Sequence, residues 1–152
     1  MRFGFFDQLP CAPGYSEPQR YKDIIAQIEL GDAVGFDTVW LGEIHFIREF
    51  SILADPLMVL AAAAQRTSRI RLGTAVTLLP LHNPIKIAEE AAIADILSDG
   101  RLELGCGRGT APRFCQADIS VLDAGRLAIV ATVSMSRTRA REGGKWRTQS
   151  RS

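Results

Sequence analysis

The most constraining feature of this chain is the regular return of a short apolar strand followed by a helix. Runs of β-prone residues begin near residues 2, 38, 70 and 101, and helical patterns fill the intervals between them. Such a repeat predicts βαβ units whose strands are parallel. Because the crossovers are right-handed, the carboxyl ends of all strands meet at one edge of the sheet. Ligand-binding residues are expected at that edge.

Two of the predicted helices begin with the same pair of residue types. Asp55-Pro56 and Asn83-Pro84 each place a favoured N-cap residue before a proline, which has no amide hydrogen that needs a partner at the first helical position. These helices are expected to run to about Thr67 and Leu97. The remaining predicted elements are a helix over residues 21–33 and strands over residues 2–6, 38–41, 70–76 and 101–104.

The fold class is α/β, and two architectures fit the repeat: an open doubly wound sheet or the first half of an eight-stranded barrel. A complete barrel needs about 250 residues, whereas this chain has 152, so about four β/α units are expected. The pattern fades after Pro112, and the predicted division is a half-barrel over residues 1–120 and a divergent, poorly ordered tail over 121–152. Residues 137–152 hold six basic residues and one acidic residue. Such a tail is either solvated or in contact with nucleic acid or an anionic membrane.

Composition narrows the functional classes. A net charge of +1 indicates no polyanionic partner. The cysteines Cys11, Cys106 and Cys115 are odd in number and show no CxxC spacing, and with only two histidines they predict no metal site. The longest apolar run falls well short of the roughly 20 residues that span a bilayer, and the amino terminus does not have the pattern of a signal peptide. A reduced, cytoplasmic setting is expected.

An acid and an imidazole follow the second predicted strand. Glu43 and His45 could position a ligand or move protons, because histidine titrates near neutrality and a carboxylate can fix its tautomer. Residues two apart in extended chain point their side chains to opposite faces, so the two groups need not touch. A functional pair and two unconnected loop residues both remain open on position alone.

The fourth predicted strand ends in the glycine-rich run 105–109. Its amides could approach a phosphate with Arg108 as the charged partner, or the run could be a simple tight turn. It does not match the GxGxxG dinucleotide pattern, because Thr110 stands where the last glycine is needed. Cys106 is interpreted as a small buried hydrophobic residue. His82 is interpreted as a loop or capping residue, and Trp40 as a core residue.

Three segments together resemble one protein family. They are Gly35-Phe36-Asp37-Thr38-Val39-Trp40-Leu41-Gly42-Glu43 with His45-Phe46; Gly73-Thr74-Ala75-Val76 with Leu79-Pro80 and His82-Asn83-Pro84; and Asp99-Gly100-Arg101 with Leu104-Gly105 and Gly107-Arg108-Gly109. In order and separation they are similar to the bacterial luciferase-like flavin-dependent monooxygenases over about residues 1–113. The resemblance implies a partial (β/α)8 TIM barrel.

The resemblance also implies a chemistry. Members use reduced FMN, or in sister branches the deazaflavin F420, and insert oxygen from O2 into a small organic substrate. The chain is expected to be a truncated member, which need not be active alone. By position, Glu43 and His45 would be the catalytic residues, with Glu43, Ala75 and Val76 at the flavin ring and Arg108 at its phosphate. Members often have a non-prolyl cis peptide at the position of Ala75-Val76. A separate flavin reductase and a homodimer are implied, with no nucleic-acid or membrane partner.

Two positions depart from the luciferase pattern. Ile44 stands where those members have the first of two adjacent histidines, the one tied to catalysis, and Gly107 aligns with their reactive thiol, so Cys106 does not inherit that role. Ile44 favours one alternative, an F420-dependent reductase or dehydrogenase of the same fold. The other alternative is a non-catalytic half-barrel that serves as a partner subunit or is a remnant.

Overall fold

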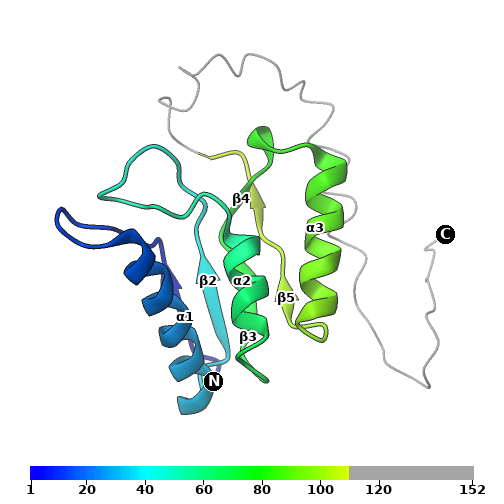
Figure 1. Cartoon of the computed structure of the whole chain (residues 1–152). Helices are drawn as coiled ribbons and strands as arrows, with labels where there is room; N and C mark the ends of the chain where they lie inside the picture. The colour runs from blue at the N-terminus through cyan, green and yellow to red at the C-terminus, as the bar shows by residue number, and fades with distance from the viewer. Residues whose placement is uncertain (110–152) are drawn as a thin grey trace, which may run out of the picture.

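The predicted strands form one parallel sheet whose order follows the chain. In a computed structural model, which describes residues 1–109, the strands β1 (Gly4–Asp7), β2 (Thr38–Leu41), β3 (Arg71–Thr74) and β5 (Leu102–Glu103) lie side by side in the order β1-β2-β3-β5 (Figure 1). The register pairs Phe6 with Trp40, Trp40 with Gly73, and Gly73 with Glu103. The carboxyl ends of the strands therefore share one edge, which we call the carboxyl edge, and the opposite edge is the amino edge.

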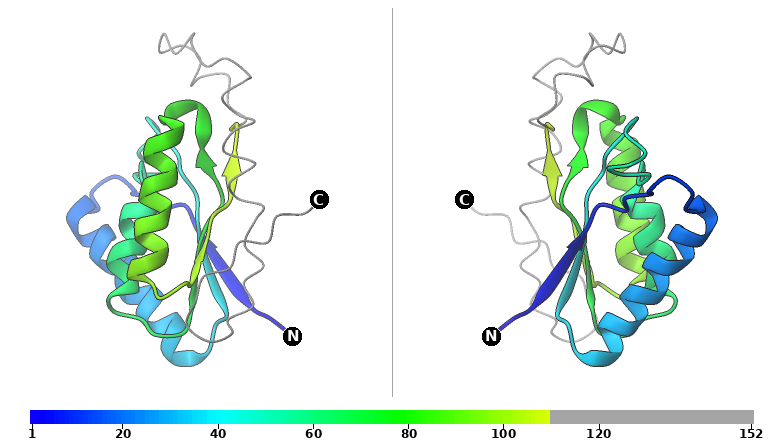
Figure 2. Two further views of the ribbon diagram at one scale, coloured as in Figure 1. Left: turned by 90° about the vertical axis from the view of Figure 1, so that its right-hand side faces the viewer. Right: turned by 90° about the vertical axis from the view of Figure 1, so that its left-hand side faces the viewer.

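Three helices cover one side of this sheet (Figure 2). They are α1 (Glu17–Val34), α2 (Pro56–Ala64) and α3 (Pro84–Leu97). The two predicted helix starts are confirmed, since the side chain of Asp55 accepts a hydrogen bond from the amide of Met58 and that of Asn83 accepts from the amides of Ile85 and Lys86. Helix α2 ends before the predicted Thr67, at Ala64.

The main core lies between the helices and the sheet. It is built from apolar side chains of β2, β3, α1, α2 and the connecting segments, all less than one-tenth exposed: Leu9, Ile24, Ile28, Val39, Leu41, Leu53, Val59, Leu60, Ala63, Ala64, Ile70 and Leu72. Burial of such side chains is the main favourable contribution to folding. The alternative architecture of an open doubly wound sheet has helices on both faces, whereas the described helices lie on one face as in a barrel.

The predicted strand over residues 70–76 is divided, which corrects the sequence interpretation. Strand β3 ends at Thr74, the Ala75–Val76 peptide is cis, and β4 (Thr77–Leu78) pairs in parallel with β6 (Cys106–Gly107) in a second, two-stranded sheet. The glycine-rich run is thus partly a strand. A short 3-10 helix, η1 (Leu79–Leu81), follows β4.

Trp40 also differs from its interpretation as a core residue, because it is only partly buried. Its ring lies over Gly73 on the neighbouring strand, where a Cβ atom would come within 2.3 Å of the ring. Within the described residues no helix has the length and apolarity needed to cross a bilayer. The predictions for residues 110–120, for the tail 121–152 and for Cys115 fall outside the described residues.

The amino edge is held by polar side chains that bind backbone groups. The Asp32 carboxylate accepts hydrogen bonds from the amides of Ser68, Arg69 and Ile70 at 2.9, 3.1 and 2.6 Å, which ties the end of α1 to the segment before β3. Burial opposes ionisation of Asp32, but these backbone hydrogen bonds outweigh it, and the net effect lowers the pKa of this carboxyl below 3.8.

We therefore expect Asp32→Asn to lower the free energy of unfolding at pH 7 by about 1 to 2 kcal/mol, because an amide oxygen cannot replace both carboxylate oxygens. The pKa of Asp32 is lower in the folded state than in the unfolded state, so the ionised carboxylate stabilises the fold above about pH 3.8. This stabilisation is lost as the pH falls through the folded-state pKa. Urea unfolding at several pH values should show the difference between wild type and variant shrinking in that range. Asp99→Asn is the control, since Asp99 has a positive φ that asparagine tolerates; an equal loss there would contradict the role of Asp32.

Candidate functional site

The Glu43 carboxylate is the centre of the carboxyl edge. Its side chain has no exposed surface, and both oxygens are hydrogen-bonded. Oε2 accepts from the backbone amide of Leu78 at 2.8 Å, while Oε1 lies 2.7 Å from His45 Nε2 and 2.8 Å from His82 Nε2. A buried carboxylate needs such partners, since an unpaired charge inside a protein is strongly unfavourable. The carboxylate is thereby fixed in one orientation.

The side chains of Glu43 and His45 are in contact, and whether the pair has a function remains a proposal. Alternation along an extended chain suggested that the two side chains need not meet, but residues 42–45 lie beyond the end of β2 and do not follow strand geometry. The amide of Ile44 donates to the carbonyl of Leu53 at 3.0 Å, which turns the loop so that both side chains reach one another.

His82 joins the same carboxylate, and sequence reasoning missed this. It is not the capping residue of α3, because that role belongs to Asn83. His82 lies between η1 and α3, and its amide donates to the carbonyl of Leu79 at 3.2 Å. The signals in the sequence were its place in the His82-Asn83-Pro84 segment of the family pattern and its position directly before a helix start, and neither shows that two imidazoles share one oxygen.

The Ala75–Val76 segment lies directly against Glu43, and its peptide has the cis geometry that the resemblance led us to expect. The amide of Glu43 donates to the carbonyl of Val76 at 3.3 Å, so Glu43 binds this segment through its backbone as well as through its carboxylate. On the other side, the amide of Thr77 donates to the carbonyl of Gly105 at 2.8 Å. The segment is held between β2 and the glycine-rich run.

Glycines let the backbones at this edge approach closely. A Cβ atom at Gly107 would lie 2.5 Å from Cγ2 of Val76, and one at Gly42 would lie 3.1 Å from the ring of Phe6 and 3.3 Å from the carbonyl oxygen of Ala75. Arg108 follows Gly107 directly and is exposed. Within residues 1–109 no acidic side chain pairs with its guanidinium. The structure therefore brings Glu43, Ala75-Val76 and Arg108 to one edge.

Other polar and thiol groups near this edge serve the fold. Asp7 at the end of β1 is held by the Arg20 guanidinium at 2.8 Å. Cys106 packs with the apolar cluster around α3, and burial raises the pKa of its thiol, so it stays protonated near neutrality. Cys11 is fully buried. Among the described residues no group of three His, Cys, Asp or Glu is arranged to hold a metal ion.

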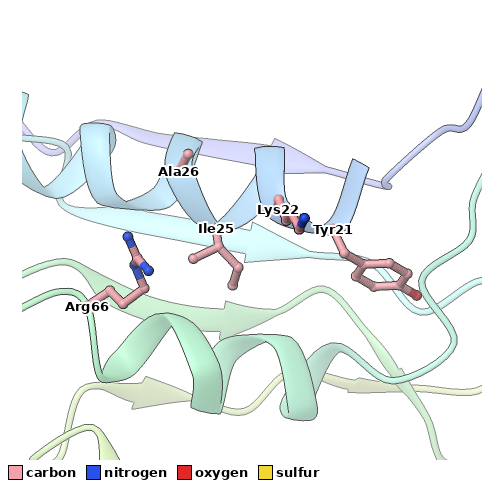
Figure 3. Close-up of a pocket in the computed structure, with 5 residues that line it drawn as sticks. All are labelled: Tyr21, Lys22, Ile25, Ala26 and Arg66. Atoms are coloured by element: carbon pink, nitrogen blue, oxygen red, sulfur yellow. The ribbon is translucent and has the colours of Figure 1, made fainter. Parts of the chain in front are cut away.

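A separate surface hollow lies between α1 and α2, away from the carboxyl-edge residues. Figure 3 shows its lining: Tyr21, Lys22, Ile25, Ala26 and Arg66. Arg66 forms an ion pair with Glu29, and the Tyr21 hydroxyl donates to the carbonyl of Ile52. Because Tyr21 and Arg66 are used in tying elements together and Lys22 is the one other polar side chain of the lining, the hollow offers no convergent chemistry. The candidate site is the open rim around Glu43.

This parallel half-barrel with a polar cluster at its carboxyl edge is the arrangement of TIM-barrel oxidoreductases. The structure superposes on the monooxygenase RslO1 from Streptomyces bottropensis with a TM-score of 0.77 and 31% identity, covering 98% of this chain and 46% of that one. The oxygenating constituent of 3,6-diketocamphane monooxygenase from Pseudomonas putida, solved with FMN, gives 0.76 and 25%, covering 96% of this chain and 43% of that one. A coenzyme F420-dependent reductase from Methanopyrus kandleri shares the fold at 22% identity with a TM-score of 0.59, covering 88% of this chain and 39% of that one.

Sequence comparison identifies the family. The family model for luciferase-like monooxygenases matches residues 1–115, and the chain belongs to this family. One similar relative is the oxygenase component of the flavin-dependent trigonelline monooxygenase of Acinetobacter baylyi, 36% identical over 110 residues, which are 72% of this chain and 30% of that protein. The chain thus spans about a third of the length of this relative.

We expect Gly105→Ala to destabilise the chain through a direct clash at this edge. A Cβ atom there would lie 2.2 Å from the carbonyl oxygen of Thr74, and a backbone atom cannot move aside cheaply, so the expected loss is about 2 to 3 kcal/mol in the free energy of unfolding. Gly100→Ala is the matched control: Gly100 has a positive φ but nothing lies within 4 Å, so about 1 kcal/mol is expected there. Urea unfolding of both variants measures the difference, and an equal or smaller loss at Gly105 would disprove the clash.

Proposed function

We propose that this chain provides the flavin-binding edge of a monooxygenase that uses reduced FMN to insert oxygen from O2 into a small organic substrate. The observation that carries the proposal is that the Glu43 cluster, the Ala75-Val76 segment and Arg108, which directly follows β6, all lie at the carboxyl edge. Membership of the luciferase-like monooxygenase family supports the same reaction class.

The residues at the carboxyl edge fit the chemistry of FMN. The ring of Phe6, which is 51% exposed, lies over Gly42, and Val76 lies against Gly107; apolar side chains of this kind suit a planar heteroaromatic ring. Arg108 has an unpaired guanidinium within the described residues, and guanidinium groups bind phosphate through paired N–H donors. A ring at Ala75-Val76 with its phosphate toward Arg108 uses both features.

Glu43 and His45 would then act on protons and orientation. A carboxylate can only accept hydrogen bonds, so His45 presents Nε2–H to it, and the contact orients the imidazole beside Glu43. Reduced FMN, when bound, would supply the electrons that activate O2. The apolar side chain of Ile44 moves no proton, so His45 carries this role on its loop.

The F420-dependent reductase or dehydrogenase remains the second candidate, because Ile44 replaces a proton-transferring residue next to the site. A non-catalytic half-barrel is the third candidate. For the first proposal we also infer a separate flavin reductase as partner, since the similar trigonelline enzyme is described as an oxygenase component. A cytoplasmic setting is consistent with the free thiols of Cys11 and Cys106.

The sharpest test of the FMN assignment compares two flavins that differ only in the phosphate. We expect the full chain to quench FMN fluorescence on binding, and Arg108→Ala to weaken FMN affinity by about 10-fold to 100-fold, the effect of losing a charge-assisted hydrogen bond. Affinity for riboflavin, which has no phosphate, should change less than twofold. Arg2→Ala, before the start of β1 and so at the amino edge, is the control and should leave both affinities unchanged.

Three outcomes would reject this assignment. Equal loss of FMN and riboflavin affinity in Arg108→Ala would show that Arg108 does not reach the phosphate. Tighter binding of F420 than of FMN would favour the reductase. No binding of either cofactor, with the chain folded, would favour the non-catalytic half-barrel.

We also propose that the protein forms a homodimer through the outer face of α3. Ile85, Ile93 and Ile96 are 72%, 56% and 74% exposed, and their spacing places them on one side of the helix. Met58, on the neighbouring α2, is 70% exposed. Large exposed apolar side chains on neighbouring helices are typical of protein–protein contacts.

Sedimentation velocity tests the dimer. We expect the wild-type chain to sediment as a dimer and the double variant Ile93→Glu/Ile96→Glu as a folded monomer, because burying two carboxylates at an interface is strongly unfavourable. Leu30→Glu makes the same type of change at an exposed leucine of α1 and should leave the dimer intact. A wild-type monomer, or a dimer that survives the double substitution, would exclude this interface.

A further inference from the structure

The third partner of the Glu43 carboxylate has no role in the function proposed so far. His82 comes from the junction of η1 and α3, 39 residues along the chain from Glu43, and its Nε2 lies 2.8 Å from Oε1. Its side chain is 24% exposed, and that of Glu43 is 0% exposed. A solvated surface histidine would not need to reach a buried carboxylate. The contact therefore indicates that His82 acts on Glu43.

The hydrogen bonds at Glu43 determine that His82 is a hydrogen-bond donor. An ionised carboxylate only accepts, so both imidazoles that share Oε1 present Nε2–H, and Oε2 accepts the backbone N–H of Leu78. His82 is consequently a donor, like His45. Two donors bind Oε1, so rotation of the carboxylate would break these hydrogen bonds. A buried carboxylate cannot replace them with hydrogen bonds to solvent.

The backbone around His82 holds the imidazole in place. Asn83 caps α3 directly after it, and Pro80 and Pro84 lie on either side in η1 and at the start of α3. The amide of His82 itself donates to the carbonyl of Leu79. A side chain carried on such a rigid junction can position another group, because it loses little conformational freedom in making the contact.

The effect of His82 passes through Glu43 to the backbone that follows the cis peptide. The Glu43 carboxylate binds the amide of Leu78, and the Glu43 amide binds the carbonyl of Val76. Residues 76–78 are thus held at both ends by one residue. Fixing the carboxylate fixes this segment, to which β6 then pairs through Thr77 and Cys106.

We propose that His82 is a positioning residue of the carboxyl edge: it holds the Glu43 carboxylate through Oε1, and through Glu43 it holds the backbone of residues 76–78. Its importance for flavin binding rests on the function proposed above, whereas its effect on the backbone does not.

Two amide-bearing substitutions separate the hydrogen bond from other effects of losing the imidazole. In His82→Gln the side-chain NH2 group can occupy the place of Nε2, and in His82→Asn the same group is one methylene too short to reach Oε1. The two variants are otherwise closely matched in polarity. Amide hydrogen exchange of Leu78, measured by NMR on the full chain, reports whether the Glu43 contact is kept. The amide of Leu72, which donates to the carbonyl of Arg101 at the amino edge, reports global stability.

We expect Leu78 to exchange at least about tenfold faster in His82→Asn than in wild type, and within about threefold of wild type in His82→Gln, with Leu72 unchanged in both. Because the chain has only two histidines, a long-range proton–nitrogen spectrum resolves both rings, and each should carry its proton on Nε2. Unchanged exchange at Leu78 in His82→Asn, equal acceleration in both variants, parallel acceleration at Leu72, or a ring without a proton on Nε2 would overturn the proposal.

The same samples separate this inference from the proposed function. FMN titration of the two variants should follow the order of Leu78 protection, with His82→Gln binding more tightly than His82→Asn. If the chain binds no FMN while Leu78 responds as expected, the positioning role stands and the flavin assignment fails. If FMN binds and Leu78 does not respond to either substitution, the positioning role fails and the flavin assignment stands.

Discussion

A carboxylate without exposed surface can exist in a folded protein only where donors replace its water, and at Glu43 these donors come from separate parts of the chain. The amide of Leu78 belongs to β4, His45 to the loop after β2, and His82 to the junction before α3. Because a missing donor would leave a buried charge underbonded, full pairing of this carboxylate requires the three segments to lie together. The geometry of the carboxyl edge follows from this requirement.

Glycines allow the backbones of these segments to approach one another closely. The amide of Gly105 and the hydroxyl of Thr74 bind one another at 3.0 Å, and a side chain at position 105 would collide with the carbonyl of Thr74. Close backbone contact here lets β4 leave the main sheet and pair with β6 instead. Packing at this edge therefore depends on the absence of a Cβ atom at Gly105.

The sequence predicted what depends on local patterns and missed what depends on long-range contacts. Strand β2 and the starts of α2 and α3 followed from β-prone runs and from Asp55-Pro56 and Asn83-Pro84, because caps and strand propensity act over a few residues. The break after Thr74 was missed, since the apolar run continues through it. The contact of Glu43 with His82 was missed because no local rule links residues on separate loops. Arg108 was placed at the carboxyl edge correctly, and its role there remains a proposal.

The two edges of the sheet use polar side chains in different ways. At the amino edge, the Arg101 guanidinium donates to the carbonyls of Ala64, Thr67, Ile70 and Ser98 and to the hydroxyl of Thr67, so it binds the backbone at the ends of α2 and α3. At the carboxyl edge, two imidazoles and one backbone amide bind the Glu43 carboxylate. Arg101 is thus a single donor group that reaches several backbone carbonyls, whereas Glu43 is a single acceptor on which donors from separate segments converge. Arg101 and Glu43 each hold separate segments through one charged side chain, and they differ in whether that side chain donates or accepts the hydrogen bonds.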